Sequence, residues 1–239
     1  MLLVPKYSEI RSRKDIDLSY TIKNVSGHFG LPIVSSPMDT VTEDEMCAAI
    51  LRTGGLGVIH RYNTIQEQCE IAAKVYEEFD QENSNLKGKI AAAIGVSGDY
   101  LERAKALHDA GVKIFCVDVA HGHHLLMKDA LTKLRSVFGE LVHIMAGNVA
   151  TLEAFNDLSD WGADSVRVGI GGGSICSTRI MTGHGVPTLQ SVLDCSASDR
   201  SALLVADGGI KTSGDIVKCL AAGADLVMLG SLLAGTDET

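Results

Sequence analysis

The sequence predicts a single (β/α)8 barrel, and three observations support that prediction. Eight short apolar segments recur along the chain, with amphipathic stretches between them. Each segment is apolar nearly throughout, as expected of parallel strands that are covered on both faces. Polar or glycine-rich residues follow the segments, at the end where barrels of this kind carry their active sites. An open, doubly wound sheet built from the same alternation is the alternative fold.

The eight predicted strands are short and rich in β-branched residues. They lie within residues 31–39, 56–61, 90–96, 113–121, 142–150, 165–172, 202–210 and 225–233. Clear helical amphipathicity is present in residues 97–110, 151–160 and 213–222. Three helices are predicted to end at Gly111, Gly162 and Gly223, because glycine closes a helix in the left-handed conformation without a steric penalty.

Length and composition indicate one globular domain over residues 1–239. The chain is 46% hydrophobic and 21% charged, which suits a large core that needs no disulfide or metal. A formal net charge of −9 argues against a nucleic-acid partner, because phosphate backbones attract a positive surface. No apolar run approaches the roughly 20 residues that span a bilayer. Residues 77–89 are predicted to be an exposed polar connection.

Five of the six cysteines are predicted to be small buried hydrophobic residues. Cys47, Cys69, Cys195 and Cys219 lie in apolar helical contexts, and Cys116 lies in the middle of a predicted strand. The cysteines form no Cys-x-x-Cys pair, and the first residues lack the apolar core of a secretory signal. A reducing cytoplasm is therefore the expected compartment.

The sixth cysteine, Cys176, lies in the segment GSICSTR that follows the sixth predicted strand. Gly169 and Gly171–Gly173 allow a tight turn and a close approach to a ligand, with N–H groups available to an anion. Hydroxyl groups and Arg179 nearby would lower the pKa of the thiol and make it a competent nucleophile. The alternative is a glycine-rich loop that carries a packed cysteine.

Two further loops predict a phosphate site. The sequence Asp-Gly-Gly begins at Asp207 after the seventh predicted strand, and Gly230-Ser231 follows the eighth. Barrels commonly bind phosphate through backbone N–H groups of these two loops. Alone, Asp-Gly-Gly is a turn signature, but its pairing with Gly-Ser favours a phosphate site in which Asp207 meets ribose hydroxyls.

Three histidines beside Asp118 raise the possibility of a zinc site. They are His121, His123 and His124, and imidazole with carboxylate is a suitable zinc ligand set. Adjacent and alternate residues of a loop point in diverging directions, and no further Cys/His spacing completes a site. We therefore predict a polar loop that faces a ligand pocket.

Seven motifs in order along the chain give it a family resemblance. They are SSPMDTVTE, GGLGVIHR, DVAHGH, AGNVAT, VGIGGGSICSTR, VADGGIKTSGD and MLGSLLAGT. Through them the chain resembles the inosine monophosphate dehydrogenase and guanosine monophosphate reductase family over almost its whole length. The resemblance implies a TIM-barrel oxidoreductase of purine nucleotide and GMP biosynthesis that uses a nicotinamide cofactor. It also implies a homo-oligomer, usually a tetramer.

The resemblance assigns roles to individual residues. The implied catalytic residues are the nucleophile Cys176, which adds to C2 of the purine, and Thr178. The implied substrate-binding residues are Ser36, Met38, Asn148, Arg167, Ser174, Asp207, Gly209, Gly230 and Ser231. The implied cofactor-binding residues are Asp118, Ala120, Gly169 and Gly171. Backbone carbonyls of Gly171, Gly173 and Cys176 are implied to hold a potassium ion, K+.

The resemblance leaves two reactions open. The dehydrogenase oxidises IMP with NAD and water to XMP, and three motifs, SSPMDTVTE, GGLGVIHR and ADGGIKTSGD, favour it. The reductase converts GMP and NADPH into IMP and ammonia. The first residues, LLVPKYSEIRSRKDIDL, and the expected absence of inserted domains favour it. A non-catalytic nucleotide-binding homologue and a barrel enzyme for another phosphorylated metabolite are alternatives from other classes.

Three departures from the family pattern are expected to matter. Gly172 stands where the family usually has proline, which is expected to loosen the loop. The inserted regulatory CBS domains are expected to be absent, with residues 80–89 in their place. The sequence ends just after the eighth predicted strand, so the flap and the last helix of the family barrel are expected to be lacking.

Overall fold

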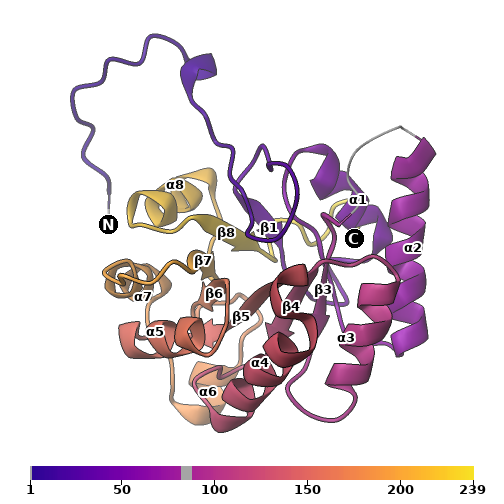
Figure 1. The fold of residues 1–239 in the computed structure, drawn as a ribbon. Helices are drawn as coiled ribbons and strands as arrows, with labels where there is room; N and C mark the ends of the chain where they lie inside the picture. Colours follow the sequence, from indigo (N-terminus) through magenta and orange to yellow (C-terminus); the bar gives the residue numbers. More distant parts are fainter. Residues whose placement is uncertain (1, 82–87) are drawn as a thin grey trace.

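The computed structural model describes residues 2–81 and 88–239 and confirms the (β/α)8 barrel (Figure 1). Its parallel strands are β1 (Ile33–Ser35), β2 (Val58–Ile59), β3 (Ala91–Ile94), β4 (Ile114–Asp118), β5 (His143–Val149), β6 (Ser165–Val168), β7 (Leu203–Asp207) and β8 (Leu226–Leu229). They are ordered β1-β8-β7-β6-β5-β4-β3-β2. A bridge between Val34 and Leu56 closes the ring, where Ser35 N–H donates to Leu56 O at 2.9 Å.

Helices alternate with the strands and lie around the barrel (Figure 1). They are α1 (Asp44–Arg52), α2 (Ile65–Gln81), α3 (Tyr100–Asp109), α4 (Leu125–Phe138), α5 (Leu152–Asp160), α6 (Thr178–Thr182), α7 (Thr188–Cys195) and α8 (Ser213–Ala221), with 3-10 turns η1 (Arg13–Asp15) and η2 (Gly139–Leu141). The three predicted amphipathic helices are confirmed as α3, α5 and α8. Among the described residues, no helix combines the length and the apolar character needed to cross a membrane.

The prediction of an exposed connection over residues 77–89 is wrong for residues 77–81, which are helical. Helix α2 continues to Gln81, because Phe79 lies one helical turn after Val75 and extends the buried face of the helix. Residues 82–87 lie outside the described residues, and so does most of the segment expected to replace the inserted domains.

Glycine positions set the boundaries between helices and strands as the sequence predicts. Gly111, Gly162 and Gly223 have φ angles of +97°, +115° and +110°, respectively. Each lies two residues after the last residue of a helix and precedes a strand that is buried along most of its length. At the other end of the repeat, Thr151 and Thr212 cap α5 and α8 by accepting backbone N–H hydrogen bonds. The loops at the carboxyl ends of the strands are thereby anchored on both sides.

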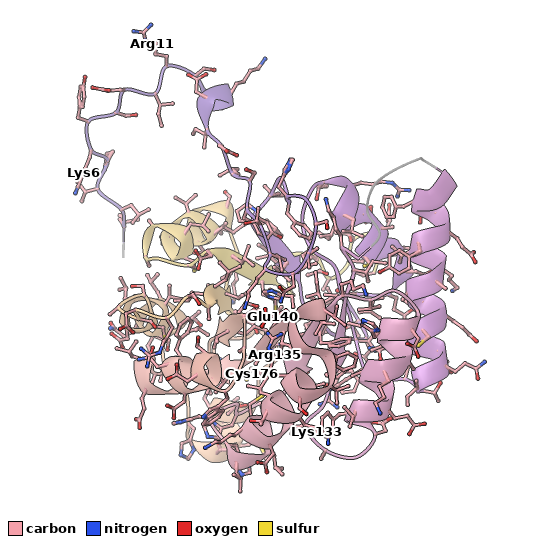
Figure 2. All side chains as sticks on the ribbon, in the orientation of Figure 1. Lys6, Arg11, Lys133, Arg135, Glu140 and Cys176 are labelled. Carbon is pink, nitrogen blue, oxygen red and sulfur yellow. The ribbon has the colours of Figure 1, made fainter. Side chains whose placement is uncertain are left out.

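The amino ends of the strands are covered by residues 20–29. Tyr20 and Phe29 pair as an antiparallel bridge, and Phe29 is buried. Asn24 Nδ2 donates to Val142 O at 3.0 Å, and Lys23 Nζ lies 2.9 Å from Glu140 Oε2. The preceding residues, 2–19, are all exposed and stand away from the barrel (Figure 2).

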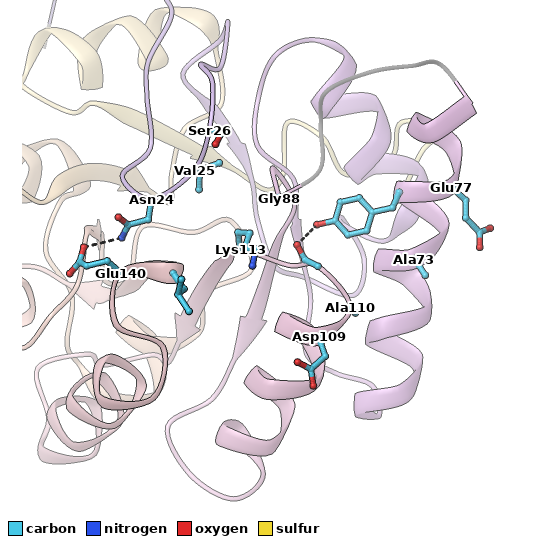
Figure 3. A pocket seen from close by; sticks show the side chains of 13 residues that line it. Asn24, Val25, Ser26, Ala73, Glu77, Gly88, Asp109, Ala110, Lys113 and Glu140 are labelled. Atoms are coloured by element: carbon cyan, nitrogen blue, oxygen red, sulfur yellow. Dashed lines mark hydrogen bonds between the residues drawn. The ribbon is translucent and has the colours of Figure 1, made fainter.

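A cavity of about 800 Å³ lies at this same end of the barrel (Figure 3). Residues 24–26, helix α2 and the end of α3 line it, and Tyr76 Oη donates to Gly111 O at 2.9 Å at its edge. None of the residues singled out by the sequence as catalytic or ligand-binding lies in its wall. The cavity is therefore separate from the chemistry predicted at the opposite end.

We predict that Gly57→Ala destabilises the barrel. A Cβ at Gly57 would lie 2.5 Å from Cys47 Sγ and 2.8 Å from Cys47 Cα, so α1 would have to move away from β2. Overpacking of this kind costs about 1–3 kcal/mol, measurable by urea unfolding monitored by circular dichroism. Gly30→Ala is the matched control, since the nearest atom to its Cβ would be 4.0 Å away. Equal free energies of unfolding for the two variants would contradict this packing.

Candidate active site

A buried arginine connects the carboxyl ends of four strands. Arg167 of β6 donates from Nη2 to Asp118 Oδ1 at 2.7 Å and to Asn148 Oδ1, and from Nη1 to Cys116 Sγ at 2.9 Å. Its Nε lies 3.6 Å from Asp207 Oδ2. Burial opposes the charge of this side chain, but Cys116 and the carboxylates of Asp118 and Asp207 outweigh it and hold the pKa of Arg167 above its ordinary value. Arg167 is therefore a buried cation that fixes two carboxylates.

Asn148 extends this network to the loops that follow β6 and β7. Its Nδ2 donates to Asp207 Oδ2 and to Gly169 O, both at 2.8 Å. Burial raises the pKa of Asp207, while Arg167 and Asn148 act in the opposite direction. Neither Arg167 nor Asn148 lines the pockets described below. Arg167 is buried and Asn148 is partly exposed. Within the chain both side chains position carboxyl groups, and the expected binding of substrate by them stays a prediction.

The loops after β6 and β7 pack backbone against backbone. A Cβ at Gly169 would lie 1.8 Å from Asp207 O, and one at Gly209 would lie 2.8 Å from Gly172 O. Gly169 and Gly209 also have φ angles of +149° and +78°, which L-residues with side chains rarely adopt. The glycines of both motifs are thus needed for the close contact of the two loops.

Cys176 lies in a tight turn between these loops and α6, with its side chain half-buried (Figure 2). Its N–H donates to Gly173 O at 3.2 Å, and its Sγ lies 3.3 Å from Thr178 Oγ1. Hydrogen bonds from the side chain and backbone of Thr178 lower the pKa of the Cys176 thiol. Arg179 acts in the same direction but contributes less, so the hydroxyl, more than the guanidinium, activates the sulfur.

The other cysteines differ from Cys176 in their environment. Burial raises the pKa of Cys47 and Cys195 to about 12 and that of Cys116 to about 11. The expectation of small buried residues is confirmed for Cys47, Cys116, Cys195 and Cys219, and the sulfur of Cys116 in addition accepts a hydrogen bond from Arg167. The expectation of burial is wrong for Cys69, which is only half-buried on α2 and packs against the edge of the core. Burial also raises the pKa of Cys69 and Cys219. The pKa of Cys176, in contrast, is lowered.

A first pocket, of about 160 Å³, lies on one side of the Cys176 turn. Its wall contains seven of the residues expected to bind the nucleotide: Ser36, Met38, Ser174, Asp207, Gly209, Gly230 and Ser231. Ser174 Oγ donates to Ser231 Oγ at 3.2 Å, which joins the loops after β6 and β8. After β8 the chain turns sharply, with the N–H groups of Leu233 and Ala234 both donating to Gly230 O, whereas those of Ser231 and Leu232 donate no hydrogen bond within the described residues. The pocket therefore has the hydroxyl and backbone donors of an anion site.

A second pocket, of about 720 Å³, lies on the other side of the turn, where Thr178 forms part of its wall. Ala120 and residues 149–151 line it from the loops after β4 and β5, and residues 182–186 line it from the end of α6. No aspartate or glutamate is among its lining residues. Of the residues expected to bind the cofactor, Ala120 lies in this wall, whereas Asp118, Gly169 and Gly171 lie beside it and hold the surrounding loops.

The histidines after β4 have separate partners in the described part of the chain. His123 Nε2 lies 2.9 Å from Asp157 Oδ2, and His124 Nδ1 accepts from Leu126 N–H at 3.1 Å to cap α4. His121 and His123 line the second pocket, joined by His184 from the end of α6. The loop after β4 therefore carries polar side chains that face a pocket, which agrees with the polar loop that the sequence predicts.

Some contributors to the site have little signal in the sequence. Arg61, after β2, donates from Nη2 to Asp118 O at 3.2 Å, and its Nε lies 3.8 Å from Asp118 Oδ2. The motif GGLGVIHR contains Arg61 but does not show that it holds a residue of β4. Thr188 at the start of α7 lies against the loop after β6, since a Cβ at Gly172 would lie 2.3 Å from its Oγ1. Only the folded chain brings these pairs together.

The fold and the site together define a (β/α)8 barrel enzyme whose chemistry lies at the carboxyl ends of the strands. The model of one protein family, described as the IMP dehydrogenase / GMP reductase domain, matches residues 1–239. The chain belongs to this family.

Curated relatives that are named as dehydrogenases and as reductases match the whole chain. An inosine-5'-monophosphate dehydrogenase from Cryptosporidium parvum is 39% identical over 276 residues, which cover 68% of that protein. One from Bacillus subtilis is 33% identical over 361 residues and 73% of its length. A GMP reductase from Leishmania major is 32% identical over 367 residues and 74% of its length. All three alignments cover 100% of this chain.

We predict that Thr178→Ala raises the pH at which Cys176 becomes reactive. The thiolate is the reactive form, and the Thr178 hydrogen bonds hold its pKa below the ordinary value. Iodoacetamide modification of Cys176, followed by peptide mass spectrometry across pH, measures the midpoint. Thr178→Ser, which keeps the hydroxyl, is expected to leave the midpoint unchanged. A midpoint that Thr178→Ala does not move would refute this activation.

We also predict that Gly172 and Thr188 are energetically coupled. Gly172→Ala places a Cβ against Thr188 Oγ1, and Thr188→Ala removes that oxygen. The double variant should therefore recover stability lost by Gly172→Ala, with a coupling energy of about 0.5–3 kcal/mol in a double-mutant cycle of urea unfolding. Thr188→Ser keeps Oγ1 and should give no recovery. Additive effects of the two alanine substitutions would mean that the contact does not govern the loop.

Proposed function

We propose that this chain is an IMP dehydrogenase, which converts IMP, NAD and water into XMP and NADH through covalent attachment of the purine to Cys176. The observation that carries the proposal is the position of Cys176, whose thiol pKa is lowered and whose turn separates two pockets. Family membership and relatives named for this activity support it. We propose that residues 1–239 act as one catalytic domain.

The nucleotide is proposed to bind in the first pocket with its phosphate at Ser174 and Ser231. Backbone N–H groups of Ser231 and Leu232 stand at the start of the turn after β8 and donate no hydrogen bond within the described residues. Asp207 offers a carboxylate for the ribose hydroxyls from the same wall. Because the pocket is smaller than the roughly 300 Å³ of typical small-molecule sites, a whole nucleotide extends out of it toward Cys176.

Cys176 is proposed to act as the nucleophile. Its thiolate adds to C2 of the purine, and Thr178 Oγ1, 3.3 Å from the sulfur, stabilises the anion before attack. Loss of hydride from C2 leaves a thioimidate, and attack by water at the same carbon releases XMP and restores the thiol. Met38 from the loop after β1 lines the first pocket and is proposed to contact the base.

The second pocket is suited to a nicotinamide cofactor. Its wall has threonine and histidine donors and no carboxylate, which favours the diphosphate of a dinucleotide. Such a cofactor, when bound, accepts the hydride that leaves C2. Ala120, together with Asp118, Gly169 and Gly171 beside the pocket, is proposed to orient it. NAD is the cofactor proposed for the dehydrogenase reaction.

A potassium ion is proposed at the backbone carbonyls of Gly171, Gly173 and Cys176. Oxygen atoms are suitable ligands for a hard cation. Among the described residues, the carbonyls of Gly171 and Cys176 accept no hydrogen bond, while that of Gly173 accepts one from Cys176 N–H and keeps a second lone pair. We further propose that the protein works in the cytoplasm as a homotetramer, as the family resemblance implies.

A second candidate activity is GMP reductase, with GMP and NADPH as substrates. Its support is the similarity to the Leishmania major enzyme of that name, which covers the whole chain at 32% identity. Both reactions use a nucleophile in the position of Cys176, so the site geometry serves either one. The pairing of nucleotide and cofactor therefore distinguishes them.

We predict that the protein oxidises IMP with NAD and that Cys176→Ala abolishes turnover, lowering kcat/KM by at least about 10³-fold. Absorbance of reduced nicotinamide follows the reaction, in parallel with GMP plus NADPH. Calorimetry should still detect IMP binding to Cys176→Ala, and Cys69→Ser serves as the matched control with wild-type activity. Turnover only with GMP and NADPH would establish the reductase, and binding without either turnover would identify a non-catalytic homologue.

A further inference from the structure

Arg103, on α3, is a buried arginine beside the loops that follow β2 and β3. The residue is 7% exposed, and its guanidinium donates four hydrogen bonds. Nη1 donates to Gln68 Oε1 at 2.9 Å and to Asn63 Oδ1 at 3.4 Å. Nη2 donates to Asn63 O at 2.9 Å and to Asp99 Oδ2 at 3.1 Å. A buried cation with these partners fixes the groups around it.

Gln68, on α2, extends this constraint to two strands. Its side chain is buried, and its Nε2 donates to His60 O at 2.8 Å and to Ala93 O at 2.9 Å. His60 directly follows β2, and Ala93 belongs to β3. Both residues are buried, and a buried polar group without a partner is costly. The amide that Arg103 holds therefore joins the carboxyl ends of two neighbouring strands.

From His60 the connection reaches β4 through the next residue in the chain. Arg61 Nη2 donates to Asp118 O at 3.2 Å, and its Nε lies 3.8 Å from Asp118 Oδ2. The guanidinium of Arg61 also lies over the ring of Tyr62, 5.5 Å from the ring centre. A shift of the carboxyl end of β2 would therefore move Arg61 relative to the carboxyl group of Asp118.

The connected groups lie on one side of the candidate active site. They belong to the carboxyl ends of β2, β3 and β4, and the loop after β4 contributes Ala120 to the wall of the second pocket. The first pocket is lined instead by the loops after β1, β6, β7 and β8. Arg167 lies between the two sides and is also held by Asn148 of β5. A change at Arg103 should therefore affect the second pocket more than the first.

We infer that Arg103 is a positioning residue for the second pocket, because through Gln68 and Arg61 it holds Asp118 where a nicotinamide cofactor binds. This inference rests on the proposed function, which assigns Asp118 to the cofactor. Neither Arg103 nor Gln68 lines either pocket. The effect of Arg103 on the reaction therefore passes through the end of β2 and does not require contact with a ligand.

A matched control lies at the opposite end of the barrel. Arg135, on α4 (Figure 2), also donates four hydrogen bonds, and its partners are Gly162 O, Gly139 O, Val142 O and Asp164 Oδ2. These partners precede β5 and β6 and line neither pocket beside Cys176. Arg135→Met therefore removes as many hydrogen bonds as Arg103→Met does, at a distance from the proposed cofactor site.

Steady-state kinetics of the full chain test the inference. We expect Arg103→Met to raise KM for NAD about tenfold or more and to change KM for IMP less than about twofold, since a small displacement of a binding group is enough for such a loss. Gln68→Met should reproduce this pattern, and Arg135→Met should leave both constants as in the wild type. An unchanged KM for NAD in the folded Arg103 and Gln68 variants, or an equal rise in Arg135→Met, would overturn the inference.

A milder variant covers the case in which Arg103→Met does not fold. Arg103→Lys keeps the charge beside Asp99 but lacks the planar fork that holds Asn63 and Gln68 together. It should raise KM for NAD by a smaller factor and leave KM for IMP unchanged. Urea unfolding followed by circular dichroism compares the stability of all the variants. A rise in KM for NAD that follows stability alone, in Arg135→Met as in Arg103→Lys, would contradict a positioning role.

Hydrogen exchange separates this inference from the proposed function. Mass spectrometry of peptides that cover residues 60–64 and 118–124 should show faster exchange in Arg103→Met than in the wild type, and no change in Arg135→Met. A wild type that does not oxidise IMP with NAD would contradict the proposed function, and the exchange of these peptides would still test the network. Unchanged exchange in Arg103→Met would overturn the inference whatever the activity of the wild type.

Discussion

The buried charge of Arg167 is the constraint around which the carboxyl end of the barrel is arranged. A guanidinium in the protein interior requires partners for its charge and its N–H groups. Asp118, Asn148 and Cys116 supply hydrogen bonds, and Asp207 supplies a second carboxylate. These partners come from β4, β5 and β7, so one side chain of β6 sets the relative positions of the loops that follow four strands.

The glycine loops depend on that arrangement. Asn148 reaches from the network to both Asp207 and Gly169 O, and this draws the loops after β6 and β7 together until their backbones touch. At that separation side chains are excluded, and Gly169 and Gly209 are the residues that permit it. The Cys176 turn adjoins this double layer of backbone, because Cys176 N–H donates to Gly173 O and Gly173 lies against Gly208.

The sequence predicts the strands well because parallel strands are buried on both faces and so appear as apolar runs. It predicts the helix ends at Gly111, Gly162 and Gly223 because a positive φ angle has a local signature. It does not predict the division of the segment after β6 into the short helices α6 and α7, where the periodic signal is brief. The sequence also does not predict contacts such as that of Cys116 with Arg167. The two residues lie 51 positions apart, and the residues around one give no indication of the other as its partner.

The same limit applies to the activation of Cys176. The sequence places Thr178 and Arg179 near the sulfur, but their relative contributions follow from the turn that brings the hydroxyl to 3.3 Å. Arg167 and Asn148 are likewise predicted to contact the nucleotide from their motifs, and the structure adds that both hydrogen-bond to the carboxyl groups of the buried network. Motifs identify which residues matter, and packing determines whether each one touches a ligand or supports one that does.

The pairing of β1 with β8 has a consequence for the order of folding. Ile33 and Val227 are partners in this pair, so the longest chain closure in the ring joins its two ends, and such closures form late. The first pocket straddles this seam, with Ser36 and Met38 on one side and Gly230 and Ser231 on the other. On the ribosome, seven strands can assemble before the pocket has both of its walls, so the pocket is completed only when β8 pairs with β1.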